Sequence, residues 1–304
     1  MADRLKKLET QFKEGYVSKE NYIKKMHMVH KTLWEYHEFI QDKNIKSIEI
    51  LRENIKFTTR DGIAIICDPE DERSIPIEIL NFGDYEASEL HTIRKFLKKD
   101  SVILDIGANI GWYCLNLSKN VPRGRIMAFE PIPTTFGYLL KNIALNNITN
   151  IIPYNFGLCD KEGGFEFYYS PKLPGATSLR LTHKNIMRQK IKCKINRLDN
   201  FITKLVTHVD FIKCDVEGAE LFVIRGGLET LKKWKPVLFL EMLRKWSAKF
   251  GYHPNEIIEL LNEIRYACYY RKNNKLVKIK KIDEKTEATN FYFLDPDKHK
   301  KYIP

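Results

Sequence analysis

A short apolar segment followed by a glycine-containing turn constrains the fold of this chain more than any other feature. A buried strand needs about four to eight mostly apolar residues, and Val102–Ile106 supplies them. Gly107 and Gly111 follow it, and because they lack a Cβ they let the backbone turn tightly and let a ligand approach closely. Asn109 lies between them and is a residue type that tolerates a left-handed backbone. The pattern predicts a strand that continues through a ligand-binding loop into a helix.

The turn differs from the one that binds dinucleotides. Dinucleotide-binding folds use G-x-G-x-x-G, which places a pyrophosphate on the N-terminus of a helix. Here the two glycines, Gly107 and Gly111, are separated by three residues. We therefore expect a nucleoside ligand that need not carry a phosphate.

The composition favours one sizeable globular domain with an appendage. The chain has 304 residues, and domains usually hold about 100 to 200. Its 51 basic and 39 acidic side chains give a formal charge of +12, which suits nucleic acid, an anionic surface or a phosphorylated substrate without selecting among them. Because the lysines are spread along the whole chain, we interpret the excess as a solvated basic surface and expect no nucleic-acid partner.

The cysteines and the N-terminus indicate the compartment. The six cysteines show neither a C-x-x-C pair nor the spacing of zinc ligands, so we expect reduced thiols rather than disulfides or a zinc site. The first residues carry heptad-like charge instead of an apolar signal core, and no segment approaches the about 18 apolar residues of a membrane span. The expectation is a cytoplasmic protein without a membrane span.

Residues 1–42 are predicted to form a helical hairpin that is separate from the rest of the chain. Gly15 separates two helical patterns, and Ser18 can cap the second helix. In that helix apolar residues recur at alternating steps of four and three, the pattern of a coiled-coil seam: Tyr22, Met26, Val29, Leu33, Tyr36 and Ile40. Because the stripe is shorter than the about three to four heptads of a convincing coiled coil, packing on the same chain and homo-oligomerisation both stay open.

Two further regions are predicted after the hairpin. In residues 43–84, short β-branched stretches and the hairpin signal Asp61-Gly62 predict a small antiparallel β cap. In residues 85–304, a helix is expected over 85–97, and beyond it strands and helices alternate. This alternation predicts a parallel sheet with helices on both faces. Antiparallel strands are expected near the C-terminus, at 267–270, 276–279 and 290–294.

One long loop interrupts the alternation. Two strands, expected at 165–169 and 191–195, are joined by a segment that contains prolines and a glycine. Loops longer than about 12 to 15 residues without structure of their own are usually functional or disordered. We interpret residues 171–190 as a candidate substrate lid, with Ser178 and His183 as candidate substrate contacts.

The residues that follow each strand are the candidate site residues, because ligands of open α/β sheets bind outside the carboxyl ends of the strands. Glu130 follows the second strand, where an acid can accept hydrogen bonds from both hydroxyls of a ribose. The remaining candidate site residues lie at or after the ends of the other strands: Asp105, Gly107, Asn109 and Gly111 with the first strand; Asn155, Gly157 and Asp160 with the third; Asp215 and Glu217 with the fourth; and Glu241 with the fifth. So many carboxylates at one edge suit a cationic ligand.

Four segments occur in order between residues 85 and 245: D-I-G-A-N-I-G at 105–111, F-E-P at 129–131, F-I-K-C-D-V-E-G-A-E at 211–220 and L-E at 240–241. Weaker similarities lie at 158–160 and 225–227. With these segments the chain resembles the FkbM-type family of class I, S-adenosylmethionine-dependent methyltransferases. The resemblance implies a Rossmann-like α/β fold with a mostly parallel seven-stranded sheet. It also implies O-methylation, often of a sugar hydroxyl in a glycan, capsule, lipopolysaccharide or natural product, and it does not extend to residues 1–42.

The resemblance implies a cofactor site and a catalytic cluster. The cofactor site comprises Glu86, Asp105, Gly107, Ala108, Asn109, Gly111, Glu130, Pro131, Asn155, Gly157, Asp160 and Asp215. Asp215, Glu217 and Glu241 are candidates for deprotonating the acceptor, either as a general base or through a divalent metal, and their spacing does not decide between the two. Lys213 is a further candidate substrate contact.

Three alternatives stay open. Asp215 and Glu217 can instead serve as a helix N-cap and as a first-turn acid favoured by the helix dipole. The net charge, together with Lys213 close to Asp215, fits an RNA 2′-O-methyltransferase on the same fold, although the sequence has no obvious RNA-binding module. The third alternative is a catalytically idle scaffold that assembles through its N-terminal helices.

Overall fold

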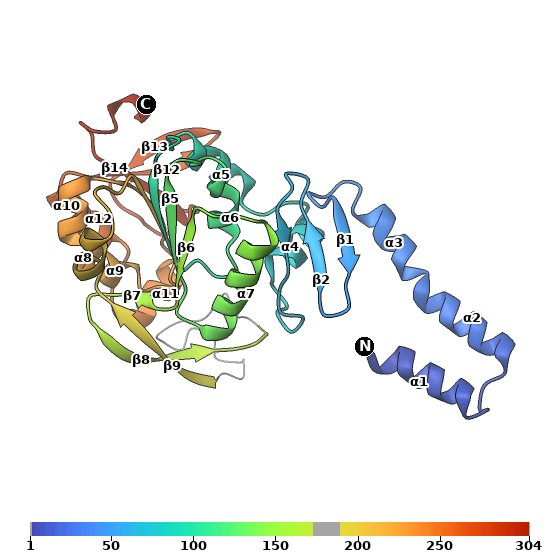
Figure 1. Ribbon diagram of the computed structural model, residues 1–304. Helices are drawn as coiled ribbons and strands as arrows, with labels where there is room; N and C mark the ends of the chain where they lie inside the picture. Colours follow the sequence, from blue (N-terminus) through green and yellow to red (C-terminus); the bar gives the residue numbers. More distant parts are fainter. Residues whose placement is uncertain (1, 173–188, 304) are drawn as a thin grey trace.

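A large α/β sheet forms the centre of the computed structural model, which describes residues 2–172 and 189–303 (Figure 1). The strands of this sheet are β4 (Val102–Ile106), β5 (Arg125–Phe129), β6 (Ile151–Tyr154), β10 (Phe211–Cys214), β11 (Val237–Glu241), β12 (Ala267–Lys272), β13 (Lys275–Ile279) and β14 (Asn290–Leu294). Within the described residues the order is β13-β12-β14-β11-β10-β4-β5-β6. The strands from β11 to β6 are parallel, and β14, β12 and β13 are antiparallel.

The predicted α/β class is confirmed, and the sheet is one strand larger than the seven expected. The described sheet has eight strands because β13 pairs with β12 in a hairpin at its edge. The hairpin turns at Asn273 and Asn274, which both have positive φ, as tight two-residue turns of this kind require. The three antiparallel strands predicted near the C-terminus are confirmed.

Helices cover both faces of the sheet, as predicted. Successive strand residues point to opposite faces, so that Ile103 and Leu104 belong to two different cores. One core includes α5 (Ala87–Arg94), α6 (Trp112–Ser118) and α7 (Pro133–Leu145). The other includes α8 (Leu198–Phe201), α9 (Glu220–Gly226), α10 (Leu228–Trp234) and α12 (Asn255–Glu263). The helix expected over 85–97 is shorter, because its N-cap Glu86 is left-handed and its last helical residue is Arg94.

A second, smaller sheet contains β7 (Gly157–Leu158), β8 (Gly163–Tyr169) and β9 (Gln189–Asn196), in the order β7-β9-β8. The predicted strands at 165–169 and 191–195 are confirmed as the antiparallel pair β8 and β9. Only 171, 172, 189 and 190 of the candidate lid are described. The candidate contacts Ser178 and His183 therefore lie outside the described residues.

The predicted antiparallel cap packs on the first face of the main sheet. It consists of β1 (Ser47–Ile50), β2 (Ile55–Thr58) and β3 (Ala64–Ile65), followed by α4 (Ile75–Phe82). Asn142 and Asn146 of α7 hydrogen bond to the backbone of Ile66 and Ala64, so the cap is fastened to that helix. Ile65 and Ile79 belong to the same core as α5 to α7.

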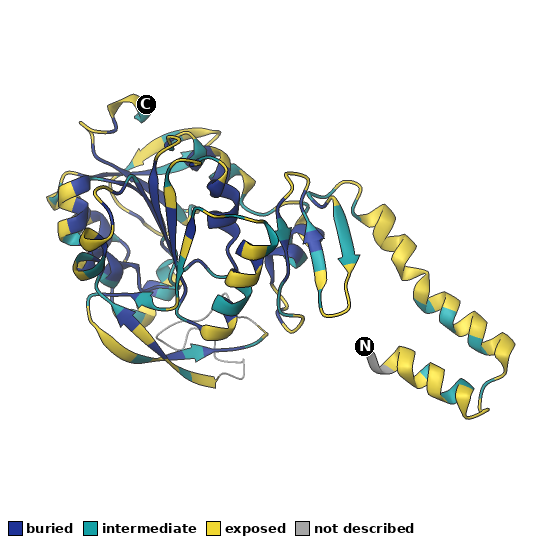
Figure 2. Cartoon of the chain, viewed as in Figure 1, coloured by how far each residue is buried: buried dark blue, intermediate teal, exposed yellow. Residues whose placement is uncertain are grey.

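Three helices extend from the cap away from the body of the molecule (Figures 1 and 2). They are α1 (Ala2–Lys13), α2 (Lys19–His30) and α3 (Thr32–Phe39). The Ser18 hydroxyl caps α2 by accepting a hydrogen bond from the Asn21 amide, and the rings of Phe12 and Tyr22 stack with centroids 4.5 Å apart. We call α1 to α3 the N-terminal arm. The predicted domain boundaries after residues 42 and 84 remain a prediction.

All six cysteines are free, and all but Cys67 are buried. Among the described residues, no helix combines the length and apolar character needed to cross a membrane. The segment that follows β11 forms α11 (Arg244–Ser247), which lies beside the carboxyl end of that strand.

Candidate active site

The loop after β4 lies directly against the loop after β10. Gly107 has a φ of 76°, and a Cβ at this residue would come within 1.9 Å of the Asp215 carbonyl oxygen. Asn109 is also left-handed, with a φ of 50°. Only glycine fits the contact at Gly107, and a short polar side chain suits the backbone at Asn109. The two loops that carry the candidate site residues therefore form one surface.

Glu130 sits at the end of β5, where its carboxylate organises the neighbouring loops. One oxygen accepts a hydrogen bond from the Asn109 amide at 3.0 Å and the other from the Ile132 amide at 2.9 Å. Burial raises the pKa of Glu130 to about 7. Each carboxylate oxygen has a second lone pair, so this group can still accept hydrogen bonds from a ligand.

A first cavity opens beside Glu130, at the carboxyl ends of β4, β5 and β10. Its polar wall comes from Gly107, Asn109, Glu130, Asp215 and Glu217. Its apolar wall consists of Ile132, Leu158, Phe167 and Ile195, together with Val216 and Ala219. We name this space the cofactor cavity.

A second cavity adjoins the cofactor cavity and is far more polar. Both cavities are lined by Asn109, Asp215 and Glu217, so they meet at these three residues. Beyond them the second cavity extends to the cap and to α11, with Arg73, Ser74, Glu86, Glu241, Lys245 and Trp246 among its lining residues. We name this space the acceptor cavity.

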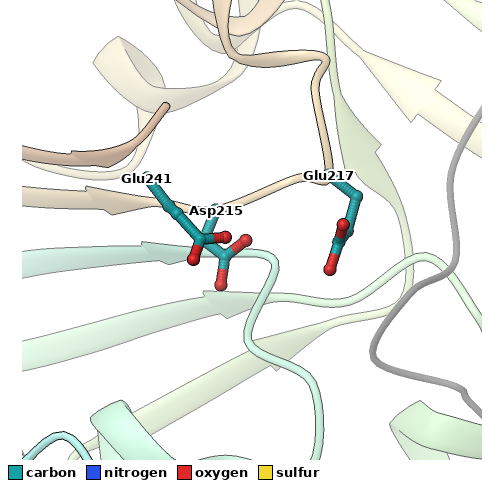
Figure 3. A group of neighbouring side chains, drawn as sticks. All are labelled: Asp215, Glu217 and Glu241. Carbon is teal, nitrogen blue, oxygen red and sulfur yellow. The ribbon is translucent and has the colours of Figure 1, made fainter. Parts of the chain in front are cut away.

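Three predicted catalytic residues come together where the cavities meet. Asp215 follows β10, and Glu241 ends the neighbouring parallel strand β11, so the sheet register brings them side by side. Oxygen atoms of Asp215, Glu217 and Glu241 lie within 4.8 Å of one another, and Figure 3 shows Asp215 and Glu241 side by side with Glu217 next to them. Burial and the neighbouring carboxylates raise the pKa values of Glu217 and Glu241 well above their ordinary range.

The loop that carries Asp215 and Glu217 is held by a buried acid. Glu220 accepts hydrogen bonds from the amides of Val216 and Gly218, at 3.0 and 3.1 Å, and burial raises its pKa to about 7. Helix α9 begins at Glu220, and its N-cap is Ala219. The interpretation of Asp215 and Glu217 as a helix cap and a first-turn acid is therefore wrong, because Glu220 holds the first-turn position.

Lys213 is buried beneath the loops rather than placed for contact with a substrate. Its ammonium donates to the Gly107 carbonyl at 2.9 Å and lies 3.6 Å from Asp105 and 3.5 Å from Asp215. Burial favours the neutral amine, but the carboxylates of Asp215 and Asp105 outweigh it and raise the pKa of Lys213. Lys213 lines neither cavity. The prediction of a substrate contact is corrected to that of a buried counter-ion.

Several predicted cofactor residues support the cofactor cavity without lining it. Asp105 is buried and accepts a hydrogen bond from the Cys114 amide at the start of α6. Asn155 donates to the Glu130 and Pro131 carbonyls, which fixes the turn after β5. Ala108, Gly111 and Asp160 also lie outside the lining. Pro131 and Gly157 line the cavity as predicted.

Glu86, which was predicted as a cofactor residue, lies in the other cavity. It lines the acceptor cavity instead of the cofactor cavity, with a left-handed φ of 50°. Burial raises the pKa of Glu86 to about 7. Glu86, Asn109 and Glu217 all have positive φ and all line the acceptor cavity, and strained backbone of this kind is common in functional sites.

Several lining residues were not identified from the sequence. Phe167 and Ile195 belong to β8 and β9, whose alternation predicts strands but not which face closes a cavity. Arg73 and Ser74 come from the cap, about 140 residues before Asp215 in the chain. Lys245 and Trp246 follow β11, and their position just after a strand end is a signal that could have identified them.

The known proteins to which this chain is similar include methyltransferases. Methyltransferase 1 of Beauveria bassiana is 30% identical over 145 residues, which cover 42% of this chain and 58% of the relative. The 2-O-methyltransferase NoeI of Sinorhizobium fredii is 28% identical over 150 residues, which cover 45% of this chain and 61% of the relative. The chain thus spans about three fifths of the length of these curated relatives.

A solved structure, the methyltransferase FkbM of Methylobacillus flagellatus, is 16% identical with a TM-score of 0.41, covering 65% of this chain and 44% of that one. The family model described as the methyltransferase FkbM domain matches residues 105–271, which is more than half of the chain. The matched residues include the loop after β4, Glu130, and the carboxylates of Asp215, Glu217 and Glu241. This chain is a methyltransferase of the FkbM family.

Proposed function

We propose that this protein is an S-adenosylmethionine-dependent O-methyltransferase that acts on a hydroxyl of a sugar or glycan precursor. One observation carries the proposal: the cofactor cavity and the acceptor cavity meet at Asn109, Asp215 and Glu217, next to Glu241. A methyl donor in one cavity and a hydroxyl in the other would face each other across carboxylates. The similarity to the 2-O-methyltransferase NoeI supports an oxygen acceptor.

The cofactor cavity fits S-adenosylmethionine in both polarity and charge. Glu130 is a buried carboxylate whose free lone pairs suit the two ribose hydroxyls. The apolar wall from Ile132 to Ile195 suits the adenine. Asp215 and Glu217, at the other end, suit the positive charges of the sulfonium and the α-amino group.

The chain contributes positioning and a proton acceptor to the reaction. When bound, the cofactor supplies an electrophilic methyl group. The acceptor cavity holds the hydroxyl oxygen in line with that group and excludes water, which accounts for most of the rate gain in such displacements. The raised pKa values of Glu217 and Glu241 make these carboxylates stronger bases than ordinary ones, and they can take the hydroxyl proton as the oxygen is methylated.

The charge of the acceptor cavity favours a neutral polyhydroxylated acceptor over RNA. Among the described lining residues, two basic side chains, Arg73 and Lys245, stand against six acids: Asp71, Glu78, Glu86, Asp215, Glu217 and Glu241. Arg73 is already paired with Glu78, at 3.0 Å. Even where raised pKa values leave some of these acids protonated, a phosphate backbone would meet more acids than cations here, so the RNA alternative loses the support that the overall charge of +12 lends it.

The carboxylate cluster also offers the oxygen ligands that a divalent cation such as Mg²⁺ prefers. Two forms of the mechanism therefore differ in one measurable respect. If the cluster acts as a general base alone, a chelator leaves methyl transfer unchanged. If Asp215, Glu217 and Glu241 hold a cation that lowers the pKa of the hydroxyl, a chelator abolishes transfer and added Mg²⁺ restores it.

The acceptor class is tested by incubating purified protein with labelled S-adenosylmethionine and separate panels of nucleotide sugars, capsule oligosaccharides and RNA. The proposal predicts label on a sugar hydroxyl and none on RNA. Label on RNA alone would overturn it in favour of the RNA alternative, and failure to bind the cofactor by calorimetry would favour the idle scaffold.

The six free cysteines fit a reducing compartment, so we propose that the reaction takes place in the cytoplasm.

A further inference from the structure

Tyr252 lines neither cavity, yet it contacts the loop between them. We call this loop, residues 215–219, the carboxylate loop. Tyr252 follows η3 (Ala248–Phe250), on the segment after β11, and it is buried. Its hydroxyl donates a hydrogen bond to the Gly218 carbonyl at 2.9 Å and accepts one from the Leu221 amide at 3.4 Å. One buried hydroxyl therefore joins the carboxylate loop and the start of α9 to the segment after β11.

Glu220 belongs to the same hydrogen-bond network. One of its oxygens, Oε1, accepts from the amides of Val216 and Gly218. The other, Oε2, lies 3.3 Å from the Tyr252 hydroxyl. Glu220 is buried as well, and in a buried network of this kind each bond depends on its neighbours. Both the amide and the carbonyl of Gly218 are thus bonded, the amide by Glu220 and the carbonyl by Tyr252.

The backbone of the carboxylate loop packs directly on the segment after β11. Gly218 has a φ of 99°, and a Cβ at this residue would lie 2.8 Å from the carbonyl carbon of Trp246. Next to it, Glu217 has a φ of 55°. A residue other than glycine keeps such a backbone only where the surrounding contacts impose it. The hydrogen bonds at Gly218 are the contacts closest to Glu217 along the loop.

The two segments that Tyr252 joins supply walls of both cavities. The carboxylate loop lines the cofactor cavity through Asp215, Val216, Glu217 and Ala219. The segment after β11 lines the acceptor cavity through Leu243, Lys245 and Trp246. In a methyl transfer the reacting carbon and oxygen must approach to about 3 to 3.5 Å. The placement of these two walls relative to each other therefore affects the rate of the reaction.

We propose that Tyr252 is a positioning residue, which fixes the carboxylate loop against the segment after β11 and so holds the methyl donor in line with the acceptor. The inference rests on the proposed function, because that function assigns the two cavities to the two reactants. Tyr252 acts through the loop and contacts neither reactant. A displacement of about 1 Å by a residue far from the chemistry can cost about 10²-fold in rate.

Tyr252→Phe tests the proposal, and Tyr266→Phe is its matched control. Tyr266 lies in the same core, and its hydroxyl donates to the Pro236 carbonyl at 2.8 Å, but it lines neither cavity. Each variant loses one buried hydrogen bond to a backbone carbonyl, so we expect similar losses of stability. Tyr252→Phe alone is expected to lower kcat, by about tenfold or more, with the Kd of S-adenosylmethionine and the KM of the acceptor changed by less than about threefold.

Gly218→Ala displaces the carboxylate loop without touching Tyr252. Its Cβ would collide with the Trp246 backbone, so we expect the same loss of kcat. Gly251→Ala is the control: Gly251 also has a positive φ, of 80°, but no described atom lies within 4 Å of a Cβ at this residue. Alanine strains the backbone at both glycines, and only Gly218→Ala is expected to lower kcat.

Hydrogen exchange of the peptide that covers residues 216–221 gives a readout that needs no acceptor. Tyr252→Phe is expected to speed exchange there, because the loop opens more often, and Tyr266→Phe is expected to leave it unchanged. Unchanged exchange in Tyr252→Phe, or faster exchange with a wild-type kcat, would overturn the proposal. Absence of methyl transfer by the wild-type protein would instead overturn the proposed function, and exchange would still decide whether Tyr252 holds the loop.

Discussion

At the scale of single residues, Lys213 links the two loops of the site. It neutralises Asp105 and Asp215 and donates to Gly107, with only 4% of its surface exposed. Removing one partner of a buried charged group costs about 3 to 5 kcal/mol, because the remaining charge stays buried. Lys213→Met is therefore expected to lower the free energy of unfolding by that amount at pH 8.

The loss in Lys213→Met should depend on pH. Burial already raises the pKa of Asp105, and without the lysine it rises further. A group whose pKa is higher in the folded state contributes stability at low pH and loses it as pH rises. The variant should therefore be closer to wild type at pH 5 than at pH 8. Denaturant unfolding at both values checks this, with the exposed Lys161→Met as control; equal losses at both values would contradict the assignment.

The pH dependence of methyl transfer follows from Glu217 and Glu241. Burial and mutual repulsion raise their pKa values, so the basic form of the cluster is lost at a higher pH than for ordinary carboxylates. We expect kcat/KM to fall as pH decreases, with an apparent pKa well above 4.5. Activity that stays constant from pH 8 down to pH 5 would argue against a proton acceptor in this cluster.

The residue-level chemistry could be predicted only in part. Glu130, Asp215, Glu217 and Glu241 were identified because each lies at or just after the end of a recognisable strand. The role of Lys213 was not, because its position in β10 does not reveal whether its side chain points to a ligand or to a buried acid. The cavity that Glu86 lines could not be predicted for a related reason: a helix start does not indicate which cavity its residues face.

At the scale of elements, the contact between the loops after β4 and β10 is the most demanding one. Gly107→Ala would place a Cβ 1.9 Å from the Asp215 carbonyl oxygen, at a φ of 76° that alanine disfavours. We expect this variant to lose cofactor binding. Gly137→Ala is the control, since Gly137 lies in helix α7 with open space around it, and alanine there should stabilise by up to about 1 kcal/mol. Calorimetric titration with S-adenosylmethionine distinguishes the two; normal affinity in Gly107→Ala would contradict the loop contact.

The elements themselves were largely predictable. Apolar runs such as Val102–Ile106 and Val237–Leu240 have the length and flanking residues of buried strands, and both are strands of the parallel part of the sheet. The closure of the cofactor cavity by Phe167 and Ile195 was not predictable, because it depends on how β8 and β9 are placed relative to the main sheet. Such placement is decided by long-range packing rather than by local pattern.

At the scale of the whole molecule, the cap and the main sheet form one continuous core, while the N-terminal arm extends away from it. Heptad spacing alone left intrachain packing and dimerisation open for the arm. In the structure Tyr22 stacks on Phe12 of α1, while Leu33 and Tyr36 are exposed.

Asp215 lies where both cavities meet, so it tests the proposed function most directly. The measurement is single-turnover methyl transfer at saturating S-adenosylmethionine by Asp215→Ala, using an acceptor found for the wild-type enzyme. Because Glu220 holds the loop and Asp105 stays beside Lys213, we expect the variant to remain folded, with an unfolding transition lowered by the loss of one partner of Lys213, and to lose methyl transfer by about 10² to 10⁴-fold. A folded Asp215→Ala variant that transfers methyl groups at a near-normal rate would contradict a catalytic site at the junction of the two cavities.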